Sequence, residues 1–285
     1  MRKQTLWKAI PLTTAILLTL SGCGGTPSQS QSNQSMTEDT TSISPGKQPS
    51  SSTTVKDGAE SEPSIGDDLH PRLSDGNEVM KAIRKELNME NVVLPSSFPL
   101  AKGRYVGAVI TKNTPDDLDV NFYSTGQPLS LNDPSLKKSD LEISWLASYE
   151  VKTDANPNST DIFPETDLQN IPKDMNVDLG HGIRGLAEGA AGSQYLTWQE
   201  GRWTLQIRSR SEDQMNNSGI AKKMVEYLES HRLPAPKDKG LFHVQYANGG
   251  DQVRVTTSWQ DGKRLHQLKT DQIPLDALRM VVSVK

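Results

Sequence analysis

Apolar side chains recur at two different spacings along this chain, and the two spacings separate its helices from its strands. A period of three and four residues occurs in residues 77–87 and again in residues 218–231. An apolar stripe at that period is typical of a helix that packs on one side against a core. In the first segment the stripe consists of Val79, Ile83 and Leu87. We therefore predict two amphipathic helices.

Alternation of apolar and polar residues, which is the spacing of a half-buried strand, occupies most of the remaining apolar sequence. Turn-forming residues separate the alternating segments and join several of them into hairpins. The predicted strands and hairpins are residues 104–112, 120–123, 141–151, 195–208, 241–246 and 253–268, and residues 275–284 form a last helix or strand. Because the helices do not alternate with the strands, the sequence predicts an α+β fold. It is a twisted antiparallel sheet of hairpins with two or three helices packed on it.

Two irregular segments interrupt this pattern. Residues 126–140 are rich in Pro, Ser, Asn and Asp and indicate a loop, and residues 153–176 contain three prolines. The second segment is long for a connection without regular structure, so it either wraps the surface or makes a functional edge. We expect a single domain over residues 76–285, and the alternative is two sub-domains that divide near residues 156–176.

Two hairpins share a short motif. Trp198-Gln199-Glu200-Gly201-Arg202 and Trp259-Gln260-Asp261-Gly262-Lys263 each combine a tryptophan-led strand, an acidic-glycine turn and a basic residue that begins the return strand. Glycine supplies the positive backbone angle that a tight hairpin turn needs. The motif is compatible with a duplicated unit and with turn chemistry alone, and the sequence does not decide between them.

The N-terminal residues form a processing signal. Arg2, Lys3 and Lys8 precede a short apolar stretch, residues 10–20, as in a secretory signal peptide. The run that follows, Leu20-Ser21-Gly22-Cys23, resembles the lipobox of bacterial lipoproteins.

The resemblance to bacterial lipoproteins covers only the first two dozen residues, and it implies three things. Residues 1–22 are a signal peptide, cleavage falls between Gly22 and Cys23, and Cys23 carries a diacylglycerol thioether and becomes the acylated N-terminus, with palmitate as a typical chain. An apolar stretch of this length is too short to span a bilayer, which takes roughly 20 residues, so a lipid anchor explains how the protein is held. The alternatives are an ordinary cleaved signal with an incidental cysteine, or an uncleaved membrane anchor weakened by Pro11.

Residues 24–75 change abruptly to Ser, Thr, Gln, Gly, Pro and acidic residues. Such a composition cannot bury enough apolar surface to offset the entropy of ordering, so we predict that residues 23–75 are the lipidated cysteine and a disordered tether. A flexible chain of about 50 residues has a root-mean-square span of roughly 40 Å. The tether would let the domain stand clear of the membrane surface at the extracytoplasmic face.

Composition excludes several partner classes. The formal net charge is -4 and the isoelectric point is about 5.8. The sequence therefore lacks the excess of basic residues that is typical of nucleic-acid-binding domains, and we expect no nucleic acid partner. Cys23 is the sole cysteine, so an intrachain disulfide is impossible. The expected contacts are the membrane, through the lipid anchor, and an envelope protein partner.

Candidate catalytic and binding motifs are weak. Gly180-His181-Gly182-Ile183-Arg184-Gly185 has the spacing of a dinucleotide-binding fingerprint, but no strand and helix frame it. We predict a flexible loop or a tight packing site in this glycine-rich segment, which extends to Gly192, and this is the first place to look for a ligand or partner. The clustered carboxylates Asp116, Asp117 and Asp119 are predicted to be a solvated turn.

The remaining candidates favour structure over chemistry. The five histidines, His70, His181, His231, His243 and His266, show no metal-ligand spacing, so we expect no metal. The sequence lacks the common nucleophile and phosphate-loop motifs, so we expect no cofactor. The tryptophans Trp145, Trp198, Trp203 and Trp259 are expected to anchor the core rather than line a ligand groove.

These observations favour a membrane-anchored extracytoplasmic lipoprotein whose domain is a non-enzymatic binding or regulatory module at the cell envelope. Two alternatives stay open. One is a carrier of lipid or another small ligand with an apolar cavity, by analogy of fold only. The other is a hydrolase that acts on wall polymers with carboxylates from separate loops.

Overall fold

The fold is that of a computed structural model, which describes residues 72–138, 142–153 and 162–285. The predicted signal peptide, the lipobox with Cys23 and the predicted tether up to residue 71 lie outside these residues. So do parts of the two irregular segments, at residues 139–141 and 154–161. The last four tether residues, Arg72–Asp75, form a paired strand, so the predicted boundary at residue 76 is wrong.

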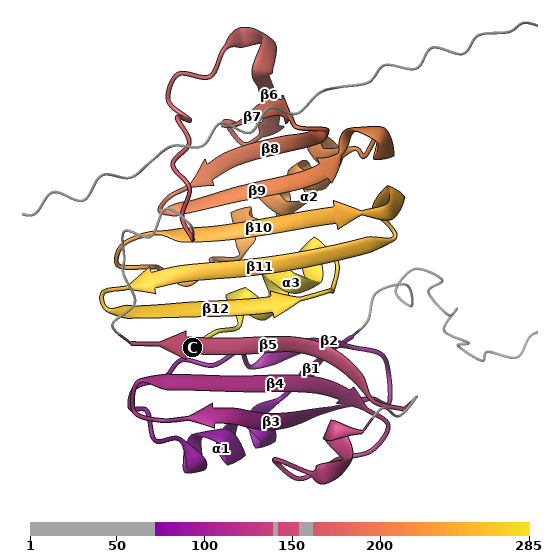
Figure 1. Cartoon of the computed structure of the whole chain (residues 1–285), viewed down its shortest axis with the longest axis vertical. Coiled ribbons are helices and arrows are strands. Elements are labelled where there is room, and N and C mark those ends of the chain that lie inside the picture. The colour runs from indigo at the N-terminus through magenta and orange to yellow at the C-terminus, as the bar shows by residue number, and fades with distance from the viewer. Residues whose placement is uncertain (1–71, 139–141, 154–161) are drawn as a thin grey trace, which may run out of the picture. The chain divides into compact units, whose positions relative to one another are not determined.

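Ten strands form one large sheet (Figure 1). In chain order they are β3 (Tyr105–Asn113), β4 (Asp117–Thr125), β5 (Ser144–Lys152), β6 (Asn176–Gly180), β7 (Ile183–Ala190), β8 (Ser193–Glu200), β9 (Trp203–Arg210), β10 (Gly240–Ala247), β11 (Gln252–Asp261) and β12 (Arg264–Thr270). Across the sheet the order is β3-β4-β5-β12-β11-β10-β9-β8-β7-β6. The C-terminal hairpins therefore sit between β5 and β9, and strands from both sides of residues 156–176 belong to the same sheet.

One neighbouring pair departs from the predicted antiparallel arrangement. β9 and β10 are parallel, with Gly240 opposite Trp203, whereas every other pair in the sheet is antiparallel. A parallel pair needs a crossover connection, and the helix α2 (Asn217–Ser230) supplies it here. The sheet is therefore mostly antiparallel, and the α+β class is confirmed.

Three α-helices and a small two-stranded sheet lie on the same side of the large sheet (Figure 1). The helices are α1 (Asn77–Glu86), α2 and α3 (Pro274–Val282), and the small sheet pairs β1 (Arg72–Asp75) with β2 (Ser97–Leu100). We call this side of the large sheet the helix-covered face and the other side the open face. The first two helices begin and end within one residue of their predicted bounds, and residues 275–284 resolve into a helix.

The core fills the space between the helices and the sheet. Its fully buried side chains include Ile83 of α1, Phe98 of β2, Phe122 of β4, Trp198 of β8 and Met224 of α2. Burying a side chain of this size contributes about 1.5–3 kcal/mol. Aliphatic and aromatic packing therefore stabilises the domain without any disulfide, as the sequence predicts.

A buried aromatic cluster lies in the middle of the sheet. The Tyr149 hydroxyl is 2.9 Å from Nδ1 of His266, and the Trp259 ring stacks on the His266 ring with 4.9 Å between centroids. Burial lowers the pKa of His266 to about 4 and raises the pKa of Tyr149. His266 is therefore neutral at physiological pH.

The glycine-rich segment after residue 179 was predicted to be a flexible loop or a tight packing site, and the flexible loop is wrong. β6 and β7 form a hairpin there, with a turn in which Gly180, His181 and Gly182 all have positive φ angles. The strands carry few large apolar residues, which hid them in the sequence. Gly185 is required by close packing, because a Cβ at this position would lie 2.9 Å from Cδ1 of Leu196.

The two tryptophan-led hairpins have matching turns. Gly201 and Gly262 adopt φ angles of 60° and 64°, and in each hairpin the glutamine side-chain amide of the motif donates to the glycine carbonyl. Trp198 and Trp259 both point into the core. The shared motif thus specifies one kind of turn.

Candidate functional site: a groove at the β3 edge

The β3 strand is one edge of the large sheet, since it pairs with β4 on one side only. Which backbone groups face outward follows from two contacts. The N–H of Asn132 donates to the Ala108 carbonyl at 2.9 Å, and the N–H of Ile110 donates to Asn132 Oδ1 at 2.8 Å. Alternate residues of a strand present both backbone groups to the same side, so Val106 also faces outward.

The edge is hydrogen-bonded in its middle and unpaired at its start. Asn132 closes it at Ala108 and Ile110, using a left-handed backbone conformation with φ of 62°. Among the described residues, the outward N–H and C=O of Val106 and the N–H of Ala108 find no hydrogen-bond partner. Val106 and Ala108 are 6 % and 1 % exposed, so these three unpaired backbone groups lie at the bottom of the groove and not on an open surface.

A groove of about 330 Å³ runs along this uncovered part of the edge. One wall is the exposed side of α1, the other is the loop that follows β4, and the β3 edge forms the floor. The lining residues are Gly76, Glu78, Val79 and Ala82 on the first wall, Tyr105, Val106 and Ala108 on the floor, and Pro128, Leu129, Ser130 and Leu131 on the second wall. We call this site the edge groove.

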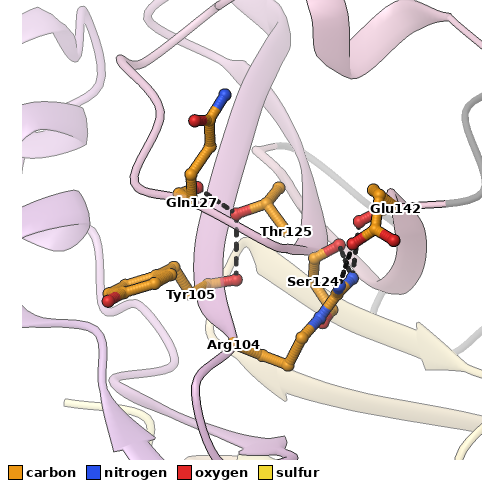
Figure 2. Close-up of polar contacts among 6 residues, drawn as sticks. All are labelled: Arg104, Tyr105, Ser124, Thr125, Gln127 and Glu142. Carbon is orange, nitrogen blue, oxygen red and sulfur yellow. Dashed lines mark hydrogen bonds and ion pairs between the residues drawn. The ribbon is translucent and has the colours of Figure 1, made fainter.

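Hydrogen bonds at the end of the β3–β4 hairpin hold the second wall in place (Figure 2). Thr125 Oγ1, at the end of β4, lies 3.3 Å from the Tyr105 carbonyl of β3 and 2.8 Å from the Gln127 carbonyl of the loop. Thr125 therefore holds the start of the loop close to the hairpin. Arg104 spans the neighbouring turn, donating to Ser124 and to Glu142. The Tyr105 ring points away from this network, and 44 % of its surface is exposed.

The second wall is also fixed by packing. Leu136, in a short 3₁₀ helix of the same loop, is buried against Gly107 on the open face of β3. A Cβ on Gly107 would lie 2.8 Å from Cδ2 of Leu136, so glycine lets the loop approach the strand closely. The groove is therefore built by folded parts on both sides.

Among the described residues that line the groove, Glu78 is the one with a charged side chain. It lies in the first turn of α1, with its side chain exposed. Most other lining residues are apolar or contribute backbone. The edge groove thus offers backbone hydrogen bonds, apolar walls and one carboxylate.

The predicted ligand loop at residues 180–185 lies at the opposite edge of the sheet, in the β6–β7 turn. Nε2 of His181 is 2.7 Å from Oε2 of Glu226 on α2, and its Nδ1 is 3.7 Å from Oε2 of Glu229. The hydrogen bond to Glu226, followed by the charge of Glu229, raises the pKa of His181. The described contacts of this turn therefore attach the hairpin to the helix.

Of the clustered carboxylates, Asp116 lies exposed in the turn before β4, as predicted, whereas Asp117 and Asp119 belong to the strand itself. Asp117 pairs with Lys112, while Asp119 lies opposite Glu150 of β5 and is half-buried. Burial and the charge of Glu150 raise the pKa of Asp119. Lys152 contacts Glu150, so the carboxylates form a mixed-charge row on the open face.

The other candidates take structural positions. Trp198, Trp203 and Trp259 are buried in the core, which agrees with their expected role as anchors, whereas Trp145 is half-buried and lies outside the core cluster. Among residues 72–138, 142–153 and 162–285, no group of three histidine, cysteine or acidic side chains is placed to hold a metal ion.

Sequence reasoning missed the edge groove. Its floor is defined by which strand lies at the edge, and its walls come from segments about 30 to 50 residues apart in the chain. The apolar run Pro128 to Leu131, inside a segment of polar turn residues, was the one local signal.

Comparison of the chain with protein-family models, curated proteins and solved structures finds no match. Within the described residues, no helix is both long and apolar enough to cross a membrane.

Proposed function

We propose that this protein is a lipid-anchored, extracytoplasmic binding module of the bacterial cell envelope, and that its domain binds a protein partner at the edge groove. The observation that carries the binding function is the start of β3, whose outward backbone groups are buried and unpaired between two mostly apolar walls. Buried backbone groups normally have a hydrogen-bond partner, so unpaired ones at the bottom of a groove favour an interaction site.

The anchoring part of the proposal rests on the sequence. The run Leu20-Ser21-Gly22-Cys23 supports lipidation of Cys23, and the polar composition of residues 24–71 supports a tether between the anchor and the domain. A membrane-bound position limits the partners to molecules of the envelope.

The carrier alternative receives less support from the fold. A carrier would hold its ligand between the sheet and the helices, where Phe98, Phe122 and Trp198 are fully buried in this domain. A filled core favours a surface groove over an internal cavity. The hydrolase alternative has no comparable support, because the carboxylates on β4 and β5 are neighbours of lysines on an exposed sheet face.

The anchor is tested by replacing Cys23 with alanine in the full chain and fractionating cells that make it. We expect the variant to keep its signal peptide and to lose labelling by radioactive palmitate, whereas Thr26→Ala should behave as the natural chain does. Unchanged palmitate labelling of Cys23→Ala would refute lipidation at this residue.

The binding function is tested in the native membrane by photo-crosslinking from Ala82, which lines the groove, and from Lys81, which does not. We expect a defined crosslinked protein from position 82 alone, and its loss when the groove is filled by a second substitution, Val79→Trp. Equal crosslinking from both positions would contradict a partner site at the edge groove.

A further inference from the structure

We infer that the edge groove binds its partner as an extended peptide segment, which adds to β3 as an eleventh strand and places a basic side chain beside Glu78. This inference rests on the proposed binding function of the groove and specifies the chemistry of the partner.

The hydrogen-bonding groups of the floor select an extended backbone. Val106 presents both an N–H and a C=O, and Ala108 presents an N–H, all directed outward from the sheet edge. An added strand supplies the matching carbonyl and amide groups at alternate residues. A helix satisfies its own backbone groups internally, so it cannot pair with these three.

The length of the groove fixes how much of the partner is bound. The open part of the edge runs from Tyr105 to Ala108, where Asn132 takes over the pairing. A strand advances about 3.3 Å per residue, so about four partner residues pair with this stretch. Their side chains would alternate between the α1 wall and the wall formed by residues 128–131.

Charge complementarity identifies one of those side chains. Val79 and Ala82 make the α1 wall apolar, and the exposed carboxylate of Glu78 lies at its start. A peptide with apolar residues and one lysine or arginine matches this wall. An acidic peptide would be repelled.

Two other occupants fit the edge groove less well. The chain's own residues 24–71 carry more acidic than basic side chains, including Asp67 and Asp68 close to the start of the domain. A second copy would bring its own β3 edge, and the walls beside that edge would meet the walls of the first copy before the strands reached the pairing distance of about 4.8 Å. A separate peptide segment of a partner avoids both problems.

The first test uses the full-length protein and a displayed library of random heptapeptides with a fixed central lysine. We expect enrichment of apolar, β-branched residues around the lysine on the natural protein. The enrichment should disappear on Ala82→Phe, which fills the groove, and persist on Lys81→Phe, which adds the same ring to the same helix outside it. No enrichment on the natural protein relative to Ala82→Phe would overturn the inference.

The second test asks whether the bound peptide is a strand. Selected peptides are synthesised with a methyl group on one backbone nitrogen at a time, and binding is followed by fluorescence anisotropy. Only every second amide of an edge strand donates to its neighbour, so methylation should weaken binding about tenfold or more at alternate positions and much less between them. Bound peptide should also slow hydrogen exchange at the amides of Val106 and Ala108.

The outcomes separate this inference from the proposed function. Uniform sensitivity to methylation together with groove-dependent crosslinking in membranes would overturn strand addition and leave the binding function standing. Failure of both experiments would overturn both. The variant Glu78→Lys tests the charge. It should weaken the binding of peptides with the central lysine about threefold and leave the binding of peptides with a central glutamine unchanged. An equal effect on both sets of peptides would overturn the expected basic side chain of the partner.

Discussion

The two edges of the sheet are closed in different ways. The β6 edge is a five-residue strand with an irregular register near its end. There the N–H of Gly180 donates a hydrogen bond to Asp178 Oδ1 at 3.0 Å. Lys173, Asp178 and Arg184 surround it with charge, and His181 fixes its turn on α2. Short, bent and charged edges resist pairing with other strands. The β3 edge is a nine-residue strand between apolar walls, which Asn132 binds in the middle and Asn88 binds at Asn113, its last residue. One edge is built against pairing, and the other leaves room for it.

The largest expected effects come from the leucines that secure each edge. Leu136 packs against β3 and holds the second wall of the edge groove in place, and Leu179 packs β6 into the core beside Gly185. Both are almost fully buried, so replacement by alanine should cost about 2–5 kcal/mol of unfolding free energy in each case. Urea unfolding would measure this cost.

The same pair of variants separates stability from binding. Leu136→Ala should lose the selected peptides, because the wall of residues 128–131 is no longer held in place, whereas Leu179→Ala should bind them normally. Anisotropy at a temperature where both variants are folded would show the difference. Equal loss of binding in the two variants would contradict the distinct roles of the two edges.

How far the sequence predicts these features depends on whether they are local. Val79 and Ile83 mark α1 through a spacing that any single turn of helix imposes, and Gly201 and Gly262 mark their hairpins through the backbone angle of one residue. Such features were predicted to within a few residues.

The edges themselves were not predictable in this way. Which strand lies at an edge depends on pairings between distant segments, such as β5 with β12, and no local pattern encodes that order. The β6–β7 hairpin was missed because Val177 and Leu179 are its few large apolar residues before the turn. The groove follows from the order of strands and was missed with it.

A smaller effect on stability is expected from a change of pH, and it should come from His266, which lies between the two edges. His266 lies in the middle of the sheet, and burial lowers its pKa from the ordinary 6.5 to about 4. The unfolded chain therefore binds a proton more readily than the folded protein between these two values. Stability should be complete above pH 6.5 and should fall by up to about 3 kcal/mol as the pH decreases towards 4.

The double variant Tyr149→Phe with His266→Phe removes the titrating ring and its hydroxyl partner together. It should flatten much of the acid dependence in urea unfolding at pH 7 and pH 4.5, and His243, whose pKa burial also lowers, accounts for a remainder. In the natural protein, protonation of His266 at low pH should speed hydrogen exchange in β3 and β6 together, because β12 lies between the two edges. An unchanged acid dependence in the double variant would show that His266 does not control it.

The smallest effect should be confined to the β6 edge and have the opposite sign. The hydrogen bond to Glu226 raises the pKa of His181, so its contribution is complete below the ordinary value of 6.5 and is lost as the pH rises through the raised value. Because the pair is exposed, the change should appear as faster hydrogen exchange in β6 and not as global unfolding. His181→Asn should remove the pH dependence at Val177 and Leu179 once exchange is corrected for its intrinsic rate, and Glu226→Gln should reduce it more than Glu229→Gln, which loses the longer contact. A β3 edge that loosened over the same pH range would show that His181 acts on the whole sheet and would contradict a local effect at β6.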